Sequence, residues 1–186
     1  MQVVLASRSP RRRLLLQAAG LAVEVRPSHI DESLLPDEGV AEAVQRLAEA
    51  KAAAIDGNDL PVIAADTLVA LDGRSLGQPV DIKHARRMLR DLSGSSHQVY
   101  TGVCVSHRGH SIRGLMRSEV CFYQLSDAQI DTYLQHNEVL DKAGAYEIQG
   151  GAASFVHAVN GPLDNVIGLP VRLTLSMLEE VSNHEC

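Results

Sequence analysis

Hydrophobic and polar positions along this chain follow two spacings, and each spacing predicts one kind of element. Short apolar runs bounded by turn residues predict strands at 3–6, 21–26, 61–71, 99–105, 118–123 and 154–159. Capping residues, glycine stops and helical apolar spacing predict helices at 10–19, 40–55, 81–92, 126–136 and 170–181. Strands and helices that alternate in this way are typical of an α/β fold.

Turn signals divide the same pattern into hairpins and loops. Asp72-Gly73 predicts a hairpin turn after the 61–71 run, and Arg108-Gly109 predicts the turn between two long strands. Segment 144–153 is rich in glycine and alanine and predicts a loop, and Asn160-Gly161 predicts another turn. The long strands from 96 to 123 are expected to form a second lobe, with a cleft between the lobes.

The composition is that of a globular protein and argues against several other classes of protein. The 186 residues, 45% of them hydrophobic and 22% charged, are enough for one domain, 1–186, or two closely joined lobes. The net charge of −6 argues against broad nucleic-acid binding, and no segment is apolar enough to span a membrane. Three cysteines without a C-x-x-C pair argue against disulfides and zinc. Because no signal segment is recognisable, a cytoplasmic protein is expected.

The junction between the first strand and the first helix is the most informative segment. Ser9 is a natural N-cap, Pro10 suits the first helical turn, and Gly20 suits the position beyond the helix end. Ser7 adds a second hydroxyl, and the junction carries four arginines, which are Arg8, Arg11, Arg12 and Arg13. A helix N-terminus favours anions, so arginines there run against the helix dipole. A phosphate ligand explains them, and a solvated basic first turn is the alternative.

Asp66 is a carboxylate in a run of residues that is otherwise apolar on both faces. Segment 61–70 reads as a central strand covered on both sides. A carboxylate buried there costs several kcal/mol or so unless it is paired, hydrogen-bonded or bound to a metal. The position therefore indicates a functional residue, and the alternative is an aspartate that only caps a turn at a strand end.

Lys51 falls inside the apolar stripe of the 40–55 helix. The stripe is defined by residues three and four positions apart, namely Val40, Val44, Leu47 and Ile55. A lysine on such a face needs an anionic partner, or else its side chain extends to water. Asp66 and a ligand phosphate are both candidate partners.

Four further polar residues, at three places in the chain, are candidates for function, and each place has a structural alternative. Asp31 and Glu32 form a carboxylate pair that could hold Mg²⁺, or lie in a solvated loop. Lys83 lies near the start of the 81–92 helix, where a solvated face is the default. Gln149 lies beside glycines that allow a ligand to approach the backbone closely, and its amide can hydrogen-bond with the edge of a nucleobase. A mobile loop is the alternative at Gln149.

Seven ordered motifs give the chain a resemblance to the Maf family of nucleoside triphosphate pyrophosphatases over nearly its full length. They are Ser7-Arg8-Ser9-Pro10-Arg11-Arg12, Asp31-Glu32-Ser33, Leu47-Ala48-Glu49-Ala50-Lys51-Ala52, Ala65-Asp66-Thr67, Ser93-Gly94-Ser95-Ser96-His97-Gln98-Val99, Asp141-Lys142-Ala143-Gly144-Ala145-Tyr146 and Val166-Ile167-Gly168-Leu169-Pro170. The resemblance implies a mixed, twisted sheet with flanking helices, two lobes around a cleft, and often a homodimer. It also implies hydrolysis of a nucleoside triphosphate to the monophosphate and pyrophosphate with a divalent cation.

The resemblance extends to a subfamily. Arg11 after the Ser-x-Ser-Pro, Thr67 after the aspartate and Gln149 in an Ile-Gln-Gly segment resemble the group acting on dTTP and UTP. Glu147 stands where that group commonly has glycine. Two alternatives remain: the same chemistry on 7-methyl-GTP or another modified nucleotide, and a non-catalytic nucleotide-binding regulator of cell division. Retention of Asp66, Lys51 and Glu32 together weighs against the regulator.

The resemblance and the charges together assign roles. Asp66, Lys51 and Glu32 are the expected catalytic residues, and Asp66 and Glu32 the expected ligands of Mg²⁺ or Mn²⁺. Asp66 acts either as the base that accepts a proton from water or as a metal ligand, and the sequence does not separate the two. The expected substrate-binding residues are Ser7, Ser9, Arg11, Arg12, Thr67, Lys83 and Gln149. The expected partner is a nucleoside triphosphate, without nucleic acid or a membrane.

Overall fold

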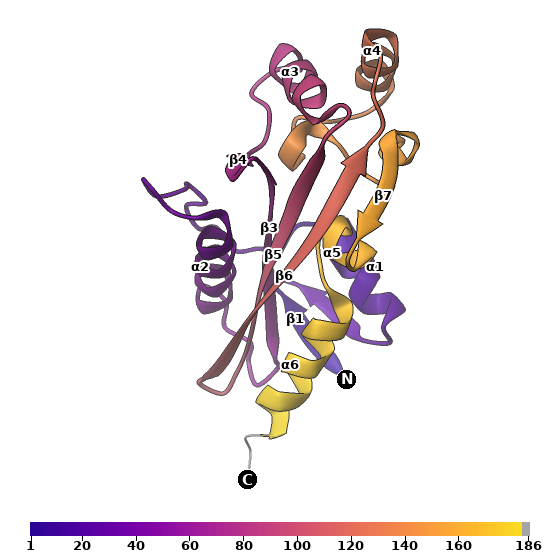
Figure 1. Cartoon of the computed structure of the whole chain (residues 1–186). Helices are drawn as coiled ribbons and strands as arrows, with labels where there is room; N and C mark the ends of the chain where they lie inside the picture. The colour runs from indigo at the N-terminus through magenta and orange to yellow at the C-terminus, as the bar shows by residue number, and fades with distance from the viewer. Residues whose placement is uncertain (184–186) are drawn as a thin grey trace. The chain divides into compact units, whose positions relative to one another are not determined.

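The structure is a computed structural model, and it describes residues 1–183 (Figure 1). The strands are β1 (Gln2–Leu5), β2 (Ala22–Val25), β3 (Val62–Leu71), β4 (Arg74–Leu76), β5 (Ser96–His107), β6 (His110–Phe122) and β7 (Val156–Asn160). The helices are α1 (Pro10–Ala18), α2 (Val40–Ala53), α3 (Ile82–Leu92), α4 (Asp127–His136), α5 (Leu163–Ile167) and α6 (Val171–Asn183), with short 3₁₀ helices η1 (Ala143–Ala145) and η2 (Ala152–Phe155). The predicted α/β class is confirmed.

Within residues 1–183 the strands form one seven-stranded mixed sheet. Its order is β2-β1-β3-β5-β6-β7, and β4 pairs with β3 off this path. β1 runs parallel to β2 and β3, while β4 and β7 pair antiparallel with their neighbours. The last register pair of β1 with β3 is Leu5 with Ile63, so β3 continues beyond the end of β1. In open α/β sheets, ligands bind outside the carboxyl ends of the strands, so the end of β1 beside β3 is a place where a site is expected.

Both predicted hairpin turns are present. Asp72 and Gly73 have positive φ values of 49° and 78°, and Arg108 and Gly109 have 47° and 85°. Two consecutive positive φ values define the turn type that matches the twist of a two-residue hairpin. The strands that meet at Arg108-Gly109 are longer than predicted, because β6 alternates exposed and covered side chains and has no continuous apolar run.

The chain divides into two compact units. Unit 1 comprises Met1–Thr67, Thr101–Met116 and the segment from Gly168 onward, and unit 2 comprises Leu68–Tyr100 and Arg117–Ile167. The second unit therefore differs from the predicted lobe at 96–123: it also contains β4, α3, α4 and β7, while the turn region of the long hairpin belongs to unit 1. No helix within residues 1–183 is long and apolar enough to cross a membrane.

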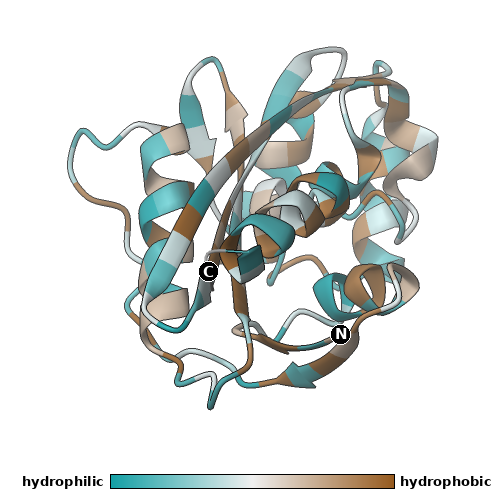
Figure 2. Cartoon of the chain, turned by 90° about the horizontal axis from the view of Figure 1, so that it is seen from below, coloured by the Kyte–Doolittle hydropathy of each residue, from teal (hydrophilic) through white to brown (hydrophobic). Residues whose placement is uncertain are grey.

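The core of unit 1 covers both faces of β1 and β3, as the uninterrupted apolar runs predicted. Val3 and Leu5 pack with residues of α1 and α6, whereas Val4 and Ala6 pack with α2. Successive side chains of a strand point to opposite faces, so one strand serves both clusters. Figure 1 shows α2 and α6 on different sides of these strands, and Figure 2 shows hydrophobic and hydrophilic residues alternating along the helices.

Gly102 in β5 sets how closely α2 approaches the sheet. A Cβ atom at this position would collide with the backbone carbonyl of Val44 on α2. Glycine inside a strand often marks such a close backbone approach. The buried residues of α2 then face the strands, and Lys51 is one of them. The stripe that predicted the buried face of this helix is confirmed.

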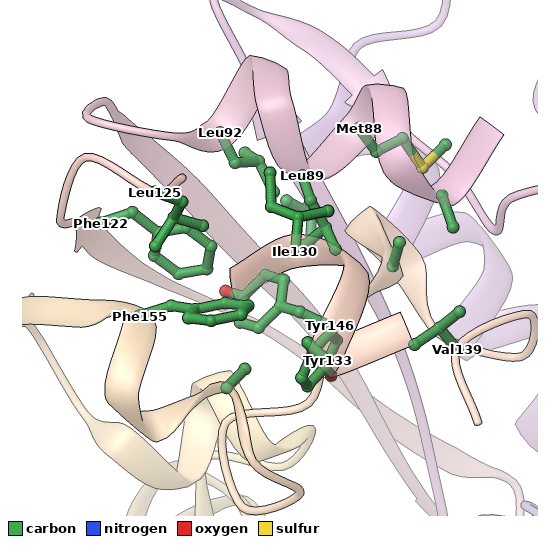
Figure 3. Packing of buried hydrophobic residues seen from close by; sticks show 14 of the residues in the cluster. Met88, Leu89, Leu92, Phe122, Leu125, Ile130, Tyr133, Val139, Tyr146 and Phe155 are labelled. Carbon is green, nitrogen blue, oxygen red and sulfur yellow. The ribbon is translucent and has the colours of Figure 1, made fainter. Parts of the chain in front are cut away.

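The core of unit 2 combines aromatic rings with aliphatic side chains, and Figure 3 shows Leu89 and Leu92 of α3 facing the rings. Phe122 makes edge contacts with Tyr146 and Phe155, at centroid distances of 5.0 and 6.0 Å. The predicted 144–153 loop contributes buried Tyr146 to this core and contains the start of η2. Helix α5 was not predicted, because its five residues are too short for a periodic signal.

Candidate functional site

The start of α1 has the geometry that its sequence predicts. Ser9 is the N-cap, and its side chain accepts a hydrogen bond from the Arg12 amide at 3.4 Å. The Oγ of Ser7, just after β1, accepts from the Ser9 amide at 3.2 Å. Pro10 occupies the first turn, and Gly20 beyond the helix has φ +85°. The loop between β1 and α1 therefore has a fixed conformation at a positive helix end.

Arg12 does not project into solvent. Its Nε donates to the Gly168 carbonyl at 2.8 Å, Nη1 donates to Ser7 Oγ at 3.2 Å, and Nη2 donates to Thr67 Oγ1 at 3.0 Å. Burial lowers the pKa of Arg12, and the carboxylate of Asp66 opposes that shift. An arginine stays protonated in proteins, so the Arg12 guanidinium brings positive charge toward Asp66.

Asp66, Lys51 and Glu32 form a charged cluster in unit 1. The Nζ of Lys51 lies 2.6 Å from Asp66 Oδ1 and 2.8 Å from Glu32 Oε2. Asp66 and Lys51 are each 6% exposed, whereas Glu32 lies in an exposed loop. Of the alternatives for Lys51, pairing with Asp66 is confirmed, and extension to water is wrong. Asp66 lies inside β3, past the last pair with β1, so the turn-capping alternative is wrong as well.

The cluster combines both kinds of charge that phosphate chemistry uses. One ammonium holds two carboxylates together, and Arg12 approaches them from α1. Cations bind phosphate oxygens, and a carboxylate orients or deprotonates water. Because Lys51 and Asp66 are buried among apolar side chains, their interaction is screened less by water than a surface pair.

The carboxylates of Glu32 and Asp66 are the candidate groups for holding a divalent cation. Among residues 1–183 no group of three or more His, Cys, Asp or Glu side chains is arranged to hold a metal. Mg²⁺, however, is commonly held by one or two carboxylates together with water and substrate phosphates. Glu32 and Asp66, both within hydrogen-bond distance of one Lys51 Nζ, supply such a pair of carboxylates.

The structure brings together eight of the predicted site residues in unit 1, which are Ser7, Ser9, Arg11, Arg12, Glu32, Lys51, Asp66 and Thr67. Lys83 and Gln149 belong to unit 2. Lys83 is exposed in the first turn of α3, whose N-cap is Asp81. Gln149 is exposed in a turn where the Gly150 amide donates to the Glu147 carbonyl at 3.0 Å.

Lys142 in unit 2 was missed as a candidate. It is buried, its Nζ lies 2.7 Å from Asp141 Oδ1, and Glu147 Oε2 lies 3.6 Å away. The signal was present: a lysine in a segment of small residues, with a carboxylate immediately before it. Thr101 was also missed; it is fully buried, and its Oγ1 lies 3.0 Å from Thr67 Oγ1. A threonine in an apolar strand gives no comparable signal.

Fold and site are those of an α/β protein with a basic helix N-terminus next to a buried ion pair. The family model described as Maf-like protein matches residues 2–181. The chain belongs to the Maf family, so the resemblance stated from the motifs is confirmed.

Two similar proteins agree with this membership of the Maf family. The dTTP/UTP pyrophosphatase of Anaeromyxobacter dehalogenans (strain 2CP-C) is 50% identical over 181 residues, 95% of this chain and 92% of that protein. The dTTP/UTP pyrophosphatase of Bacillus pumilus (strain SAFR-032) is 44% identical over 185 residues, 96% of this chain and 95% of that protein. Among solved structures, a HAM1 protein from Coxiella burnetii has a TM-score of 0.49 and 12% identity, over 97% of this chain and 99% of that chain.

Proposed function

We propose that this protein is a nucleoside triphosphate pyrophosphatase that hydrolyses dTTP and UTP to the monophosphate and pyrophosphate. The observation that carries the proposal is the buried Lys51–Asp66 pair, joined by Glu32 and close to the N-terminus of α1. Relatives named dTTP/UTP pyrophosphatase, 50% and 44% identical over nearly the whole chain, support both the reaction and the substrate.

The charges support one course of reaction. Arg11, Ser9 and the N-terminus of α1 bind phosphate oxygens through charge-assisted hydrogen bonds. Asp66 orients a water molecule and accepts its proton while the water oxygen bonds to the α-phosphorus. The bond from the α-phosphorus to the bridging oxygen breaks, and pyrophosphate leaves with the electron pair. Lys51 stabilises the negative charge that develops on the leaving group.

A divalent cation, Mg²⁺ or Mn²⁺, is part of the proposal. Glu32 and Asp66 would hold it together with phosphate oxygens of the substrate. When bound, the cation supplies further charge neutralisation at the phosphates. Asp66 as base and Asp66 as metal ligand remain two forms of the same proposal, since both require its carboxylate.

The proposal includes two exposed residues, Gln149 and Lys83, as further contacts of the substrate. The Gln149 amide carries a donor and an acceptor, which match the O4 and N3–H edge of thymine or uracil. Lys83 adds a cation for the nucleotide. A homodimer acting in the cytoplasm, with neither nucleic acid nor a membrane as partner, completes the proposal.

A nucleotide panel with product analysis tests the proposal. The purified protein is incubated with dTTP, UTP, CTP, ATP, GTP and 7-methyl-GTP in Mg²⁺ or Mn²⁺, and products are separated by anion-exchange chromatography. We expect monophosphate and pyrophosphate, with dTTP and UTP turned over fastest. Accumulating diphosphate would contradict the reaction, and a preference for 7-methyl-GTP would contradict the substrate. An Asp66→Asn preparation controls for contaminating phosphatases.

A further inference from the structure

Arg12 connects three segments of unit 1 that are far apart in the sequence. Each of its guanidinium nitrogens has a partner within the chain: Gly168 before α6, Ser7 after β1 and Thr67 in β3. The planar guanidinium presents its donors in a rigid fork, so these three contacts fix its position. Arg12 thus ties the end of β1 and the start of α1 to β3.

Thr67 shares these contacts and directly follows Asp66. Its Oγ1 accepts from Arg12, lies 3.0 Å from the Oγ1 of buried Thr101, and is 3.4 Å from the Gly168 carbonyl. Gly168 has φ +129°, a conformation that other residues rarely adopt, and its carbonyl is the acceptor for Arg12 Nε. The backbone after Asp66 is therefore held from one side by α1 and from another by the Gly168 turn.

We infer that Arg12 and Thr67 are positioning residues that fix Asp66 relative to the N-terminus of α1. The site requires the forked shape of the Arg12 guanidinium, and the positive charge of Arg12 alone is not sufficient. This inference rests on the proposed function. It assigns positioning to Arg12 and Thr67, both of which the motifs predicted to bind substrate, and it leaves phosphate binding to Arg11. A lysine at position 12 would keep the charge but has one nitrogen, which cannot reach three acceptors on different segments.

The test compares variants that keep or remove the charge. Arg12→Lys and Arg12→Ala are measured beside Arg13→Lys, which changes an exposed arginine of the same helix. Thr67→Val removes the shared Oγ1 but keeps the branched shape. For dTTP we expect Arg12→Lys and Arg12→Ala to lower kcat by about 10-fold or more with little change in KM, the pattern of a lost transition-state geometry. Arg13→Lys stays near wild type.

Two kinetic results would overturn the inference. One is Arg12→Lys with wild-type kinetics while Arg12→Ala raises KM, because Arg12 would then act by charge on the substrate. The other is a lower Tm in Arg12→Lys with an unchanged kcat of the folded fraction, which is a purely structural role. The losses in the Arg12→Lys/Thr67→Val double variant should be less than additive, since both single variants remove the hydrogen bond between Arg12 and Thr67.

Hydrogen exchange separates this inference from the proposed function. In Arg12→Lys and Thr67→Val, amides at 66–68 and 168–169 should exchange at least about 10-fold faster, while α2 amides keep their wild-type rates, as expected for local loosening. Unchanged exchange at 66–68 would overturn the positioning role whatever the kinetics. A wild-type protein that releases no pyrophosphate would instead contradict the proposed function.

Discussion

Lys51 on α2 and Asp66 on β3 form a buried ion pair, with Nζ 2.6 Å from Oδ1. Taking two charges out of water offsets much of their attraction, so such a pair is not an efficient way to stabilise a fold. Apolar side chains in the same stripe of α2 would pack without that penalty. The chain nevertheless places the pair next to Glu32 and near the N-terminus of α1, where a phosphate ligand would use the charges.

Asp66→Asn should fold and be nearly inactive. The amide keeps the shape and leaves an oxygen that accepts a hydrogen bond from Lys51, so packing in β3 is preserved. Loss of the carboxylate removes the proton acceptor or metal ligand, and the rate should fall about 100-fold or more. Circular dichroism establishes folding, and pyrophosphate release from dTTP measures the rate. Near wild-type turnover in a folded variant would contradict both proposed roles of Asp66, as proton acceptor and as metal ligand.

Lys51→Met should lose stability as well as activity. Methionine suits the apolar stripe, but Asp66 is left as a buried carboxylate without its lysine, which costs roughly 3 kcal/mol of the free energy of unfolding. Adding Asp66→Asn removes that charge, so the double variant should recover most of the loss and remain inactive. Urea unfolding measures the free energy of unfolding of the single and the double variant. The exposed Lys83→Met is the stability control, with a change within about 0.5 kcal/mol. Additive losses in the double variant would mean that the two side chains are not coupled.

Local sequence patterns were sufficient to predict much of the candidate site. The spacing of apolar residues placed Lys51 on the buried face of α2, and a single charge in an apolar strand singled out Asp66. The capping residues Ser9 and Pro10 predicted the start of α1. Each of these signals lies within a few residues of the feature that it predicts.

The remaining features depend on contacts between distant segments. Arg12 reads as a basic residue in a first helical turn, but its partners Thr67 and Gly168 are 55 and 156 positions away. Similarly, the sequence of the 144–153 segment predicts a loop, because its small residues show no helix or strand periodicity. Its buried side chain at Tyr146 bonds to His97, which is 49 positions away. Such pairings follow from the sheet order, which the pattern of apolar residues does not specify.

Stability should fall as the pH is lowered from about 6.5 towards 4 because of His97. Burial lowers the pKa of His97 to about 4, and its Nε2 lies 2.8 Å from the Tyr146 hydroxyl. Between the two pH values the unfolded chain binds a proton that the native state does not, which lowers the free energy of unfolding by about 1.4 kcal/mol per pH unit. Above pH 6.5 the contribution is fully present.

Urea unfolding at a series of pH values checks this slope. In His97→Gln the slope between pH 6.5 and 4.5 should decrease by nearly one proton, because glutamine does not titrate. His136→Gln changes an exposed histidine of α4 and should keep the wild-type slope. The same pH dependence in wild type and His97→Gln would refute a buried neutral His97 as the cause.

Gln149→Glu should reduce the preference for dTTP and UTP over GTP. An ionised carboxylate offers only acceptors, so it repels the O4 of thymine or uracil and leaves that oxygen without a donor. The ratio of kcat/KM values for dTTP and GTP should fall by roughly 10- to 100-fold, the scale of leaving one polar group of the bound base unpaired. Gln135→Glu adds the same charge at an exposed position of α4 and should leave the ratio unchanged. An unaltered ratio in Gln149→Glu would show that another residue reads the base, whereas a loss of turnover for all nucleotides at a constant ratio would place Gln149 at the phosphates.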